Sequence, residues 1–112
     1  MHLDNLKLRI SNELSEFILY LEELINDYRF DDGEALGIAL LIKKSGPSSL
    51  SDEQWCVFLE NGLLPNNYVE ECDRCTEPIP WSNMYSSIFV NRDHLCANCN
   101  FYVNKDSVLS LP

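Results

Sequence analysis

With 112 residues, 46% of them apolar and 23% charged, the chain has enough apolar side chains for a folded domain, and this composition excludes a disordered polymer. A domain of this size buries little surface, so we expect a metal, disulfides or a partner to add to its stability. The formal net charge of -10 argues against a nucleic-acid-binding face, and the acidity is concentrated in residues 1–71, which carry fourteen acids against five bases.

Neither a membrane span nor a secretion signal is expected. No apolar run reaches the roughly 18 residues of a membrane-spanning helix, and Met1–Asp4 lacks a basic start that leads into an apolar signal core. We therefore expect a cytoplasmic protein. The cysteines agree, because four of the five stand in two C-x2-C pairs, which is typical of metal ligands in a reducing compartment.

A first helix is predicted between residues 10 and 28, where apolar residues recur at spacings of four and three. Its apolar face would consist of Ile10, Leu14, Phe17, Leu21, Leu24 and Tyr28. The start is open, because Ser11 can cap a helix while Leu3 and Leu6 extend the spacing back to Asp4. The other side is acidic and is either a solvated surface or a face for a basic partner; it carries Glu13, Glu16, Glu22, Glu23 and Asp27.

A second helix is predicted over residues 34–44. Its first turn is acidic and its last turn holds two lysines, so the charges at both ends match the helix dipole. Gly46-Pro47 follows and should end the helix. The middle is apolar on nearly all sides, which predicts the central core helix or half of a homodimer interface. Gly37 would allow another helix to approach closely.

A third helix has clear local signals. Ser51 and Gln54 form a capping box, so the helix should begin immediately after Ser51. Asn61-Gly62 offers a C-terminal cap, and Pro65 prevents continuation. Cys56 falls inside this pattern, where we expect a buried thiol that acts as a small apolar side chain.

Two C-x2-C pairs separated by twenty residues follow in the C-terminal part: Cys72, Cys75, Cys96 and Cys99. In each pair both thiolates of one turn can point at the same ion, so the four sulfurs predict one tetrahedral zinc site. Four protein ligands leave no position for water, and the zinc should therefore be structural. Iron in the same cage and a reversible disulfide are the alternatives. For His94 we expect an exposed turn position, with a contact to the metal site as the alternative.

Residues 85–90 are rich in β-forming side chains, and turn-like residues follow them, which predicts a short hairpin between the two cysteine pairs. The neighbouring apolar residues would form a collar that packs this finger onto the helices, or else a stacking surface for bases: Trp81, Met84, Phe89, Phe101 and Tyr102. The expected fold is a single domain over 1–112 that is mainly α with a small β zinc ribbon. About three helices in 1–65 would pack on a four-cysteine zinc knuckle pair in 66–112.

No motif for catalysis stands out. The sequence contains neither a glycine-rich phosphate loop nor a nucleophile elbow. Its adjacent acids point to different sides of a helix or strand and make poor catalytic pairs. We therefore expect a binding protein and no enzyme.

The segments 72–80 (CDRCTEPIP) and 96–99 (CANC) resemble the four-cysteine finger of the DksA/TraR family, bacterial proteins that bind RNA polymerase through its secondary channel. The resemblance covers about a quarter of the chain. It implies that the four cysteines are zinc ligands and that RNA polymerase is a partner. The rest of the chain departs from that family, since no long helix is expected after Cys99 and the acids near residues 27–32 do not reproduce its acidic tip.

The acidic helical part favours a basic protein as partner, and the class that fits best is a bacterial immunity protein or antitoxin that inhibits a nuclease toxin. The alternative is a transcription regulator of the finger family that binds RNA polymerase. A nucleic-acid-binding ribbon would depend on Arg74, Arg92 and Lys105, too few cations for strong phosphate binding.

Overall fold

The computed structural model describes residues 2–30 and 33–109, with the side chains of residues 3–30 and 33–103. The chain divides into two compact units, which we call the helical unit (Met1–Tyr68) and the cysteine unit (Val69–Pro112). Both units are built from helices, and the described residues contain no strand, only one isolated antiparallel bridge between Glu71 and Pro78. Within the described ranges, no helix is long and apolar enough to cross a membrane.

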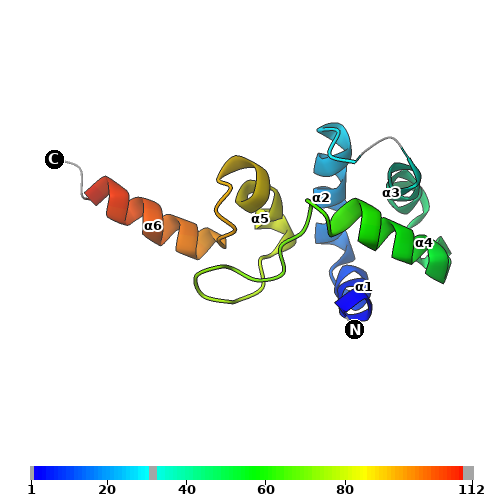
Figure 1. Ribbon diagram of the computed structural model, residues 1–112, viewed down its shortest axis with the longest axis horizontal. Helices are drawn as coiled ribbons and strands as arrows, with labels where there is room; N and C mark the ends of the chain where they lie inside the picture. Colours follow the sequence, from blue (N-terminus) through cyan, green and yellow to red (C-terminus); the bar gives the residue numbers. More distant parts are fainter. Residues whose placement is uncertain (1, 31–32, 110–112) are drawn as a thin grey trace. The chain divides into compact units, whose positions relative to one another are not determined.

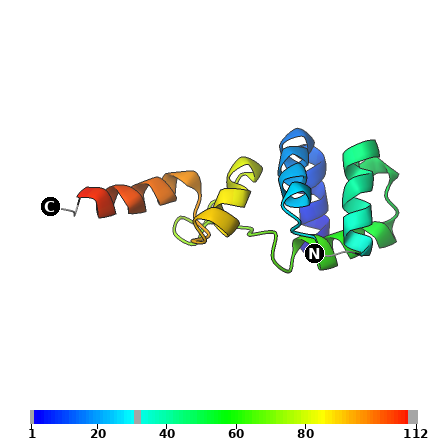
Figure 2. The same ribbon diagram turned by 90° about the horizontal axis from the view of Figure 1, so that it is seen from above.

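Over its described residues, 2–30 and 33–68, the helical unit forms four α-helices, one short 3-10 turn and one π-helical turn (Figure 1). In chain order these are α1 (His2–Asn12), α2 (Leu14–Asn26), α3 (Glu34–Ser45), η1 (Pro47–Ser49), α4 (Asp52–Val57) and η2 (Phe58–Leu63). Helices α2 and α3 run side by side, and α3 also packs against η2 (Figure 2). The buried apolar side chains of these elements form one core.

The first predicted helix is divided at Glu13 into α1 and α2. Backbone hydrogen bonds continue across the division, from Glu13 N to the Arg9 carbonyl at 2.9 Å and from Phe17 N to the Glu13 carbonyl at 3.0 Å. Ser11 does not cap a helix. Its hydroxyl donates instead to the Lys7 carbonyl at 3.0 Å, a local bond that competes with regular helical geometry and often accompanies a bend.

Most of the predicted apolar face of α2 is buried, but its far end is not. Ile10, Phe17, Leu21 and Leu24 have essentially no exposed surface, whereas Tyr28 is 91% exposed. The prediction for Tyr28 was wrong because α2 ends at Asn26 and Tyr28 adopts a φ of 57°, which turns it away from the helix face. Tyr20 is buried in its place, and its hydroxyl donates to the Asn67 carbonyl at 2.6 Å.

The second helix is confirmed as α3, and it buries one side of its apolar middle: Ile38, Ala39 and Ile42. The expectation for Gly37 was wrong, since no atom lies within 4 Å of a Cβ built there. The close approach occurs at Gly62 in η2, where a Cβ would lie 3.1 Å from the Ala35 Cβ and 3.2 Å from the Phe30 ring. Asp31 and Asp32 lie outside the described residues.

The third helix begins as predicted. Gln54 N donates to Ser51 Oγ at 3.2 Å, and Ser51 N donates back to Gln54 Oε1 at 2.9 Å, which completes the capping box. Its expected cap at Gly62 was wrong, because the chain continues through the π-helical turn η2 to Leu63. Cys56 is exposed, contrary to the buried position expected, because it lies on the solvent side of α4 while Trp55 is directed into the core.

Asn67, near the end of the helical unit, is buried at 3% exposure and hydrogen-bonds to three other segments of the unit. Its side-chain NH2 group donates to the Gly62 carbonyl at 2.6 Å and to the Arg29 carbonyl at 3.3 Å, and its backbone carbonyl accepts from Tyr20. Its side-chain oxygen is buried and has no hydrogen-bond partner in the described structure. One asparagine thus joins the ends of α2 and η2. Buried polar groups need such partners, since an unsatisfied one costs about 1–3 kcal/mol.

The cysteine unit contains α5 (Trp81–Tyr85), a π-helical turn η3 (Ser86–Val90) and α6 (Ala97–Leu109). The β hairpin predicted over 85–90 was therefore wrong. Buried Trp81, Met84 and Ser87 recur every three residues, which is helical spacing, and this packing overrides the β preference of the segment. The thirteen-residue α6 also corrects the expectation that no long helix follows Cys99.

The apolar collar is only partly formed. Trp81 and Met84 are fully buried within the described structure, whereas Phe101 and Tyr102 on α6 are 62% and 53% exposed. The apolar residues of this segment therefore divide into a buried pair on α5 and an exposed pair on α6.

Candidate metal centre

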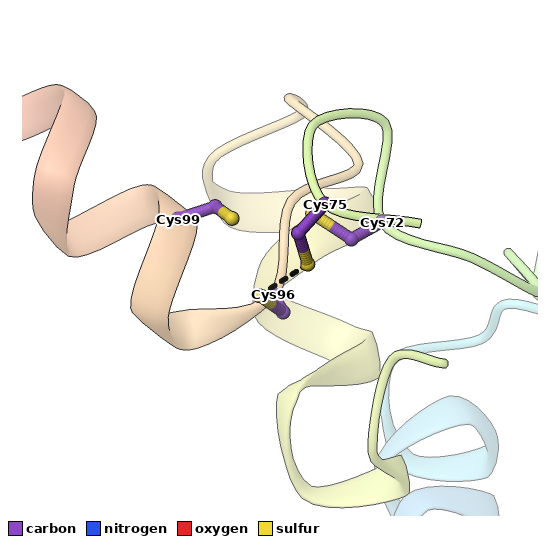
Figure 3. Close-up of side chains that lie close together, drawn as sticks. All are labelled: Cys72, Cys75, Cys96 and Cys99. Atoms are coloured by element: carbon purple, nitrogen blue, oxygen red, sulfur yellow. Dashed lines mark hydrogen bonds between the residues drawn. The ribbon is translucent and has the colours of Figure 1, made fainter. Parts of the chain in front are cut away.

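All four cysteine sulfurs of the cysteine unit converge on one point (Figure 3). Cys72 and Cys75 come from the loop before α5, Cys96 directly precedes α6, and Cys99 lies in the first turn of α6. The four Sγ atoms lie within 4.8 Å of one another, and the Cys75 and Cys96 sulfurs are 3.7 Å apart. A zinc ion with Zn–S bonds of ~2.3 Å separates its sulfurs by about 3.8 Å, so the cluster has the size of a tetrahedral site.

The first cysteine pair is held by a tight backbone turn. Cys72 N donates to the Glu77 carbonyl at 2.8 Å, and Thr76 N donates to the Cys72 carbonyl at 3.0 Å. Thr76 adopts a φ of 63°, which reverses the chain after the second cysteine. Within this turn Arg74 N donates to Cys72 Sγ at 3.4 Å. Such an amide bond orients the sulfur and stabilises its thiolate form.

The second pair is positioned by the start of α6. Asp93 accepts hydrogen bonds from Leu95 N at 3.0 Å and from the Asn100 side chain at 2.8 Å, so it fixes the loop on one side of Cys96 and the helix on the other. Cys96 and Cys99 therefore both lie at the N-terminus of α6, where the helix dipole would attract the negative charge of a metal–thiolate cluster.

His94 stands outside the cluster. Its side chain is 47% exposed and its Nδ1 lies 4.0 Å from Asp73 Oδ2, while its carbonyl accepts from Asp73 N at 3.0 Å. The described structure gathers only the four cysteines as a group able to hold a metal. The expectation of an exposed turn histidine is confirmed, and its backbone joins the two cysteine-bearing loops.

Arg74 was considered from the sequence only as a candidate nucleic-acid contact, and the position of its side chain beside the cysteine cluster was not predicted. The Arg74 guanidinium donates to Cys99 Sγ at 3.5 Å and lies 5.7 Å from the centre of the Tyr102 ring. A dication on four thiolates carries a net charge of -2, so a cation at this distance offsets part of it. The signal was available, because Arg74 stands between two predicted ligands.

Without metal, the thiols of the first pair differ sharply. Burial raises the pKa of Cys72, but hydrogen bonds from the backbone amides of Cys75, Cys96 and Arg74 and from the Cys99 side chain lower it to about 6. For Cys75, a backbone hydrogen bond at Glu77 lowers the pKa, whereas burial and the three neighbouring sulfurs raise it to about 12. The cluster thus accepts one negative charge readily and resists a second, which a dication would reverse.

The sulfurs also differ in access to solvent. Cys72, Cys96 and Cys99 are 1%, 9% and 3% exposed, whereas Cys75 is exposed. A hollow of about 490 Å³ opens beside the cluster, and Cys75, Cys96, Cys99, Arg74 and Tyr102 contribute to its lining. The centre is therefore open on the Cys75 side.

The donor set selects among metals. Four sulfurs and no oxygen suit a thiophilic ion such as zinc and disfavour magnesium and calcium, which prefer oxygen ligands. Four sulfur ligands would close the coordination sphere of a tetrahedral ion, as in structural zinc sites.

No protein-family model, curated protein or solved structure has significant similarity to this chain.

Proposed function

We propose that this chain is a small zinc-binding protein in which Cys72, Cys75, Cys96 and Cys99 hold one structural zinc ion. The convergence of four sulfurs within 4.8 Å carries the proposal. The hydrogen bonds from Arg74 support it, because the backbone amide donates to the Cys72 sulfur and the guanidinium donates to the Cys99 sulfur, as donors around metal-bound sulfurs do. The need for reduced thiols fits the cytoplasm.

The metal is tested by elemental analysis of protein purified under reducing conditions without added metal. We expect about one zinc per chain, and about one in a Cys56→Ser variant, which removes the exposed thiol outside the cluster. A Cys75→Ser variant should lose most of its zinc. Iron in place of zinc, or no metal in the parent, contradicts the proposal.

We further propose that the helical unit binds a basic protein, and that the protein is an immunity protein or antitoxin that neutralises a nuclease toxin. The exposed side of α2 supports this, since Glu16 and Glu23 follow one helix face seven residues apart with the 65% exposed Leu19 between them. An apolar side chain flanked by acids suits a partner that combines cations with an apolar contact.

The electrostatics of this face point the same way. Burial, followed by the charge of nearby Asp27, raises the pKa of Glu23. The repulsion between Glu23 and Asp27, the residue that caps the end of α2, is the smaller of the two causes, and a cationic partner would relieve it. Two basic side chains of the unit are already occupied within it: Lys7 pairs with Asp52 at 3.4 Å and Arg9 with Glu13 at 3.2 Å.

A variant that removes two charges from α2 without changing its shape tests whether the acidic face binds the partner. The Glu16→Gln/Glu23→Gln double variant preserves the shape of α2 and removes two charges. If the gene beside this one encodes a basic nuclease domain, the parent should bind that domain and inhibit it, with affinity that falls as salt rises. The double variant should bind more weakly. Binding that is unchanged by both the variant and the salt would contradict a role for the acidic face.

A transcription regulator that binds RNA polymerase is the second candidate. It is favoured by α6, which begins at the second cysteine pair and supplies the helix after the finger that the sequence had not predicted. Purification of the tagged parent chain beside a Cys75→Ser variant separates the two functions. Polymerase subunits retained only by the zinc-loaded parent support the regulator, whereas a basic nuclease domain sensitive to the α2 charges supports the inhibitor.

A further inference from the structure

The metal centre has one exposed sulfur and three buried ones. Cys75 is exposed at the hollow of about 490 Å³, while Cys96 stands 9% exposed beside it. A small neutral molecule can therefore reach the Cys75 sulfur from solvent, but the other sulfurs are largely covered. Zinc-bound thiolates remain nucleophilic, so the first sulfur that a solvent-borne electrophile meets is that of Cys75.

A second thiolate stands next to the exposed one. The Cys75 and Cys96 sulfurs are 3.7 Å apart (Figure 3), and a disulfide bond of ~2.05 Å needs them to approach by less than about 2 Å. Because the two residues lie on different loops, neither sulfur has to distort a helix to make that approach. The arrangement is that of an attacking thiolate with a resolving thiolate beside it.

We propose that Cys75 is an oxidation site for hydrogen peroxide and that its oxidation releases the zinc. The inference rests on the proposed zinc centre. The Cys75 thiolate attacks the outer peroxide oxygen, the O–O bond breaks, and Cys75 becomes a sulfenic acid as hydroxide leaves. The Cys96 thiolate then attacks the Cys75 sulfur, and a second hydroxide leaves as the disulfide forms. Two thiolates lose two electrons, and one hydrogen peroxide gains them to yield two hydroxides.

The consequence for the metal follows from the ligand count. A disulfide between Cys75 and Cys96 leaves two thiolates, Cys72 and Cys99, and a structural zinc ion requires four ligands. Zinc therefore leaves, and the cysteine unit loses the free energy that its binding supplies. A reducing thiol and fresh zinc restore the centre, because a disulfide is reversible.

The experiment treats the reduced, zinc-loaded Cys56→Ser protein with hydrogen peroxide, so that the exposed thiol outside the cluster cannot contribute. A chromogenic chelator follows zinc release, dimedone traps the sulfenic acid, and peptide mass spectrometry locates both products. We expect the dimedone adduct on Cys75, loss of about one zinc per chain, and a Cys75–Cys96 disulfide. Dithiothreitol with zinc should reverse the loss.

A Cys75→His variant in the same background separates oxidation from ligation. Histidine can occupy a zinc position without an oxidisable sulfur. A zinc-loaded variant should resist peroxide and keep its zinc under conditions that empty the parent. If this variant binds no zinc, the position of the dimedone adduct in the Cys56→Ser protein decides whether Cys75 is the oxidation site.

The outcomes distinguish the two claims. Protein that contains no zinc before peroxide is added refutes the proposed metal centre. Zinc that is present but retained at full occupancy refutes the oxidation site. So does release accompanied by a first adduct on another cysteine, or by a disulfide that excludes Cys75.

Discussion

The two units of this protein differ in how many apolar side chains each one buries. Among the described side chains, fourteen buried apolar residues belong to the helical unit, whereas the cysteine unit buries only Ile79, Trp81 and Met84 besides its cysteines. Burial of a large apolar side chain contributes about 1.5–3 kcal/mol, so the first unit has a core of its own while the second has very little. The comparison predicts that the proposed zinc stabilises the cysteine unit and not the helical unit.

Zinc removal should give the largest difference between the units. Zinc binding supplies about 10–16 kcal/mol of apparent free energy in small zinc modules, so its loss should unfold the cysteine unit. We expect amide signals of residues 69–103 to collapse on chelation while those of the α2 and α3 core persist, as measured by two-dimensional NMR. Simultaneous loss of both sets of signals would show that the helical unit also depends on the metal.

The converse experiment is Phe17→Ala in the core of the helical unit. Phe17 has no exposed surface and contacts the Phe58 ring edge-to-face at 6.3 Å, so truncation should cost about 3–5 kcal/mol in free energy of unfolding. Zinc content should stay at the parent value. Leu19→Ala, at a 65% exposed position on the same helix, is the control and should change stability by less than about 0.5 kcal/mol in urea denaturation.

A smaller effect is expected from the close approach at Gly62. Gly62→Ala places a methyl 3.1 Å from the Ala35 Cβ and 3.2 Å from the Phe30 ring, so it should destabilise the helical unit by about 1–3 kcal/mol. Gly37→Ala has open space and removes a flexible residue from a helix, so it should stabilise by about 0.5–1 kcal/mol. In thermal denaturation, Gly62→Ala should lower the melting temperature and Gly37→Ala should raise it. Equal changes in melting temperature for the two variants would argue against the packing described at Gly62.

The pH dependence of zinc affinity should be the finest probe of the cysteine unit. At pH 7, Cys75 with a pKa of about 12 still carries its proton, whereas Cys72 with a pKa of about 6 is mostly ionised. Zinc must displace the Cys75 proton, so affinity should fall at least tenfold per pH unit lowered. Below pH 6 the Cys72 proton must be displaced too, which steepens the loss to at least a hundredfold per unit.

This dependence is measured by competition with a chelator of known proton affinity. A tenfold change requires that binding release at least one proton between pH 7 and 8. An affinity that stays constant over that interval would show that Cys75 is already a thiolate in the metal-free protein.

Local signals predicted their parts of the fold well. The capping box at Ser51 and Gln54 depends on residues three apart, and it begins α4 where expected. The hairpin at 85–90 failed because β preference is decided by what a segment packs against, and the burial of Trp81 and Met84 favours a helix there. Gly62 could not be recognised, since its neighbour Ala35 is distant in sequence.

In the candidate metal site, too, the features set by local sequence were predicted and those set by tertiary packing were not. The spacing of the four cysteines predicted that their sulfurs would gather in one cluster, because each C-x2-C pair is a local turn. The order of exposure among the sulfurs and the position of Arg74 near Cys99 depend on how the two loops meet α6, and spacing does not contain that information.

The central claim is that four sulfurs of this chain bind one zinc ion, and X-ray absorption at the zinc edge tests it most directly. For reduced, native protein we predict four sulfur scatterers at ~2.3 Å from zinc and no nitrogen or oxygen in the first shell. A first shell that contains nitrogen or oxygen at ~2.0–2.1 Å, or a protein without zinc at that edge, would contradict the account.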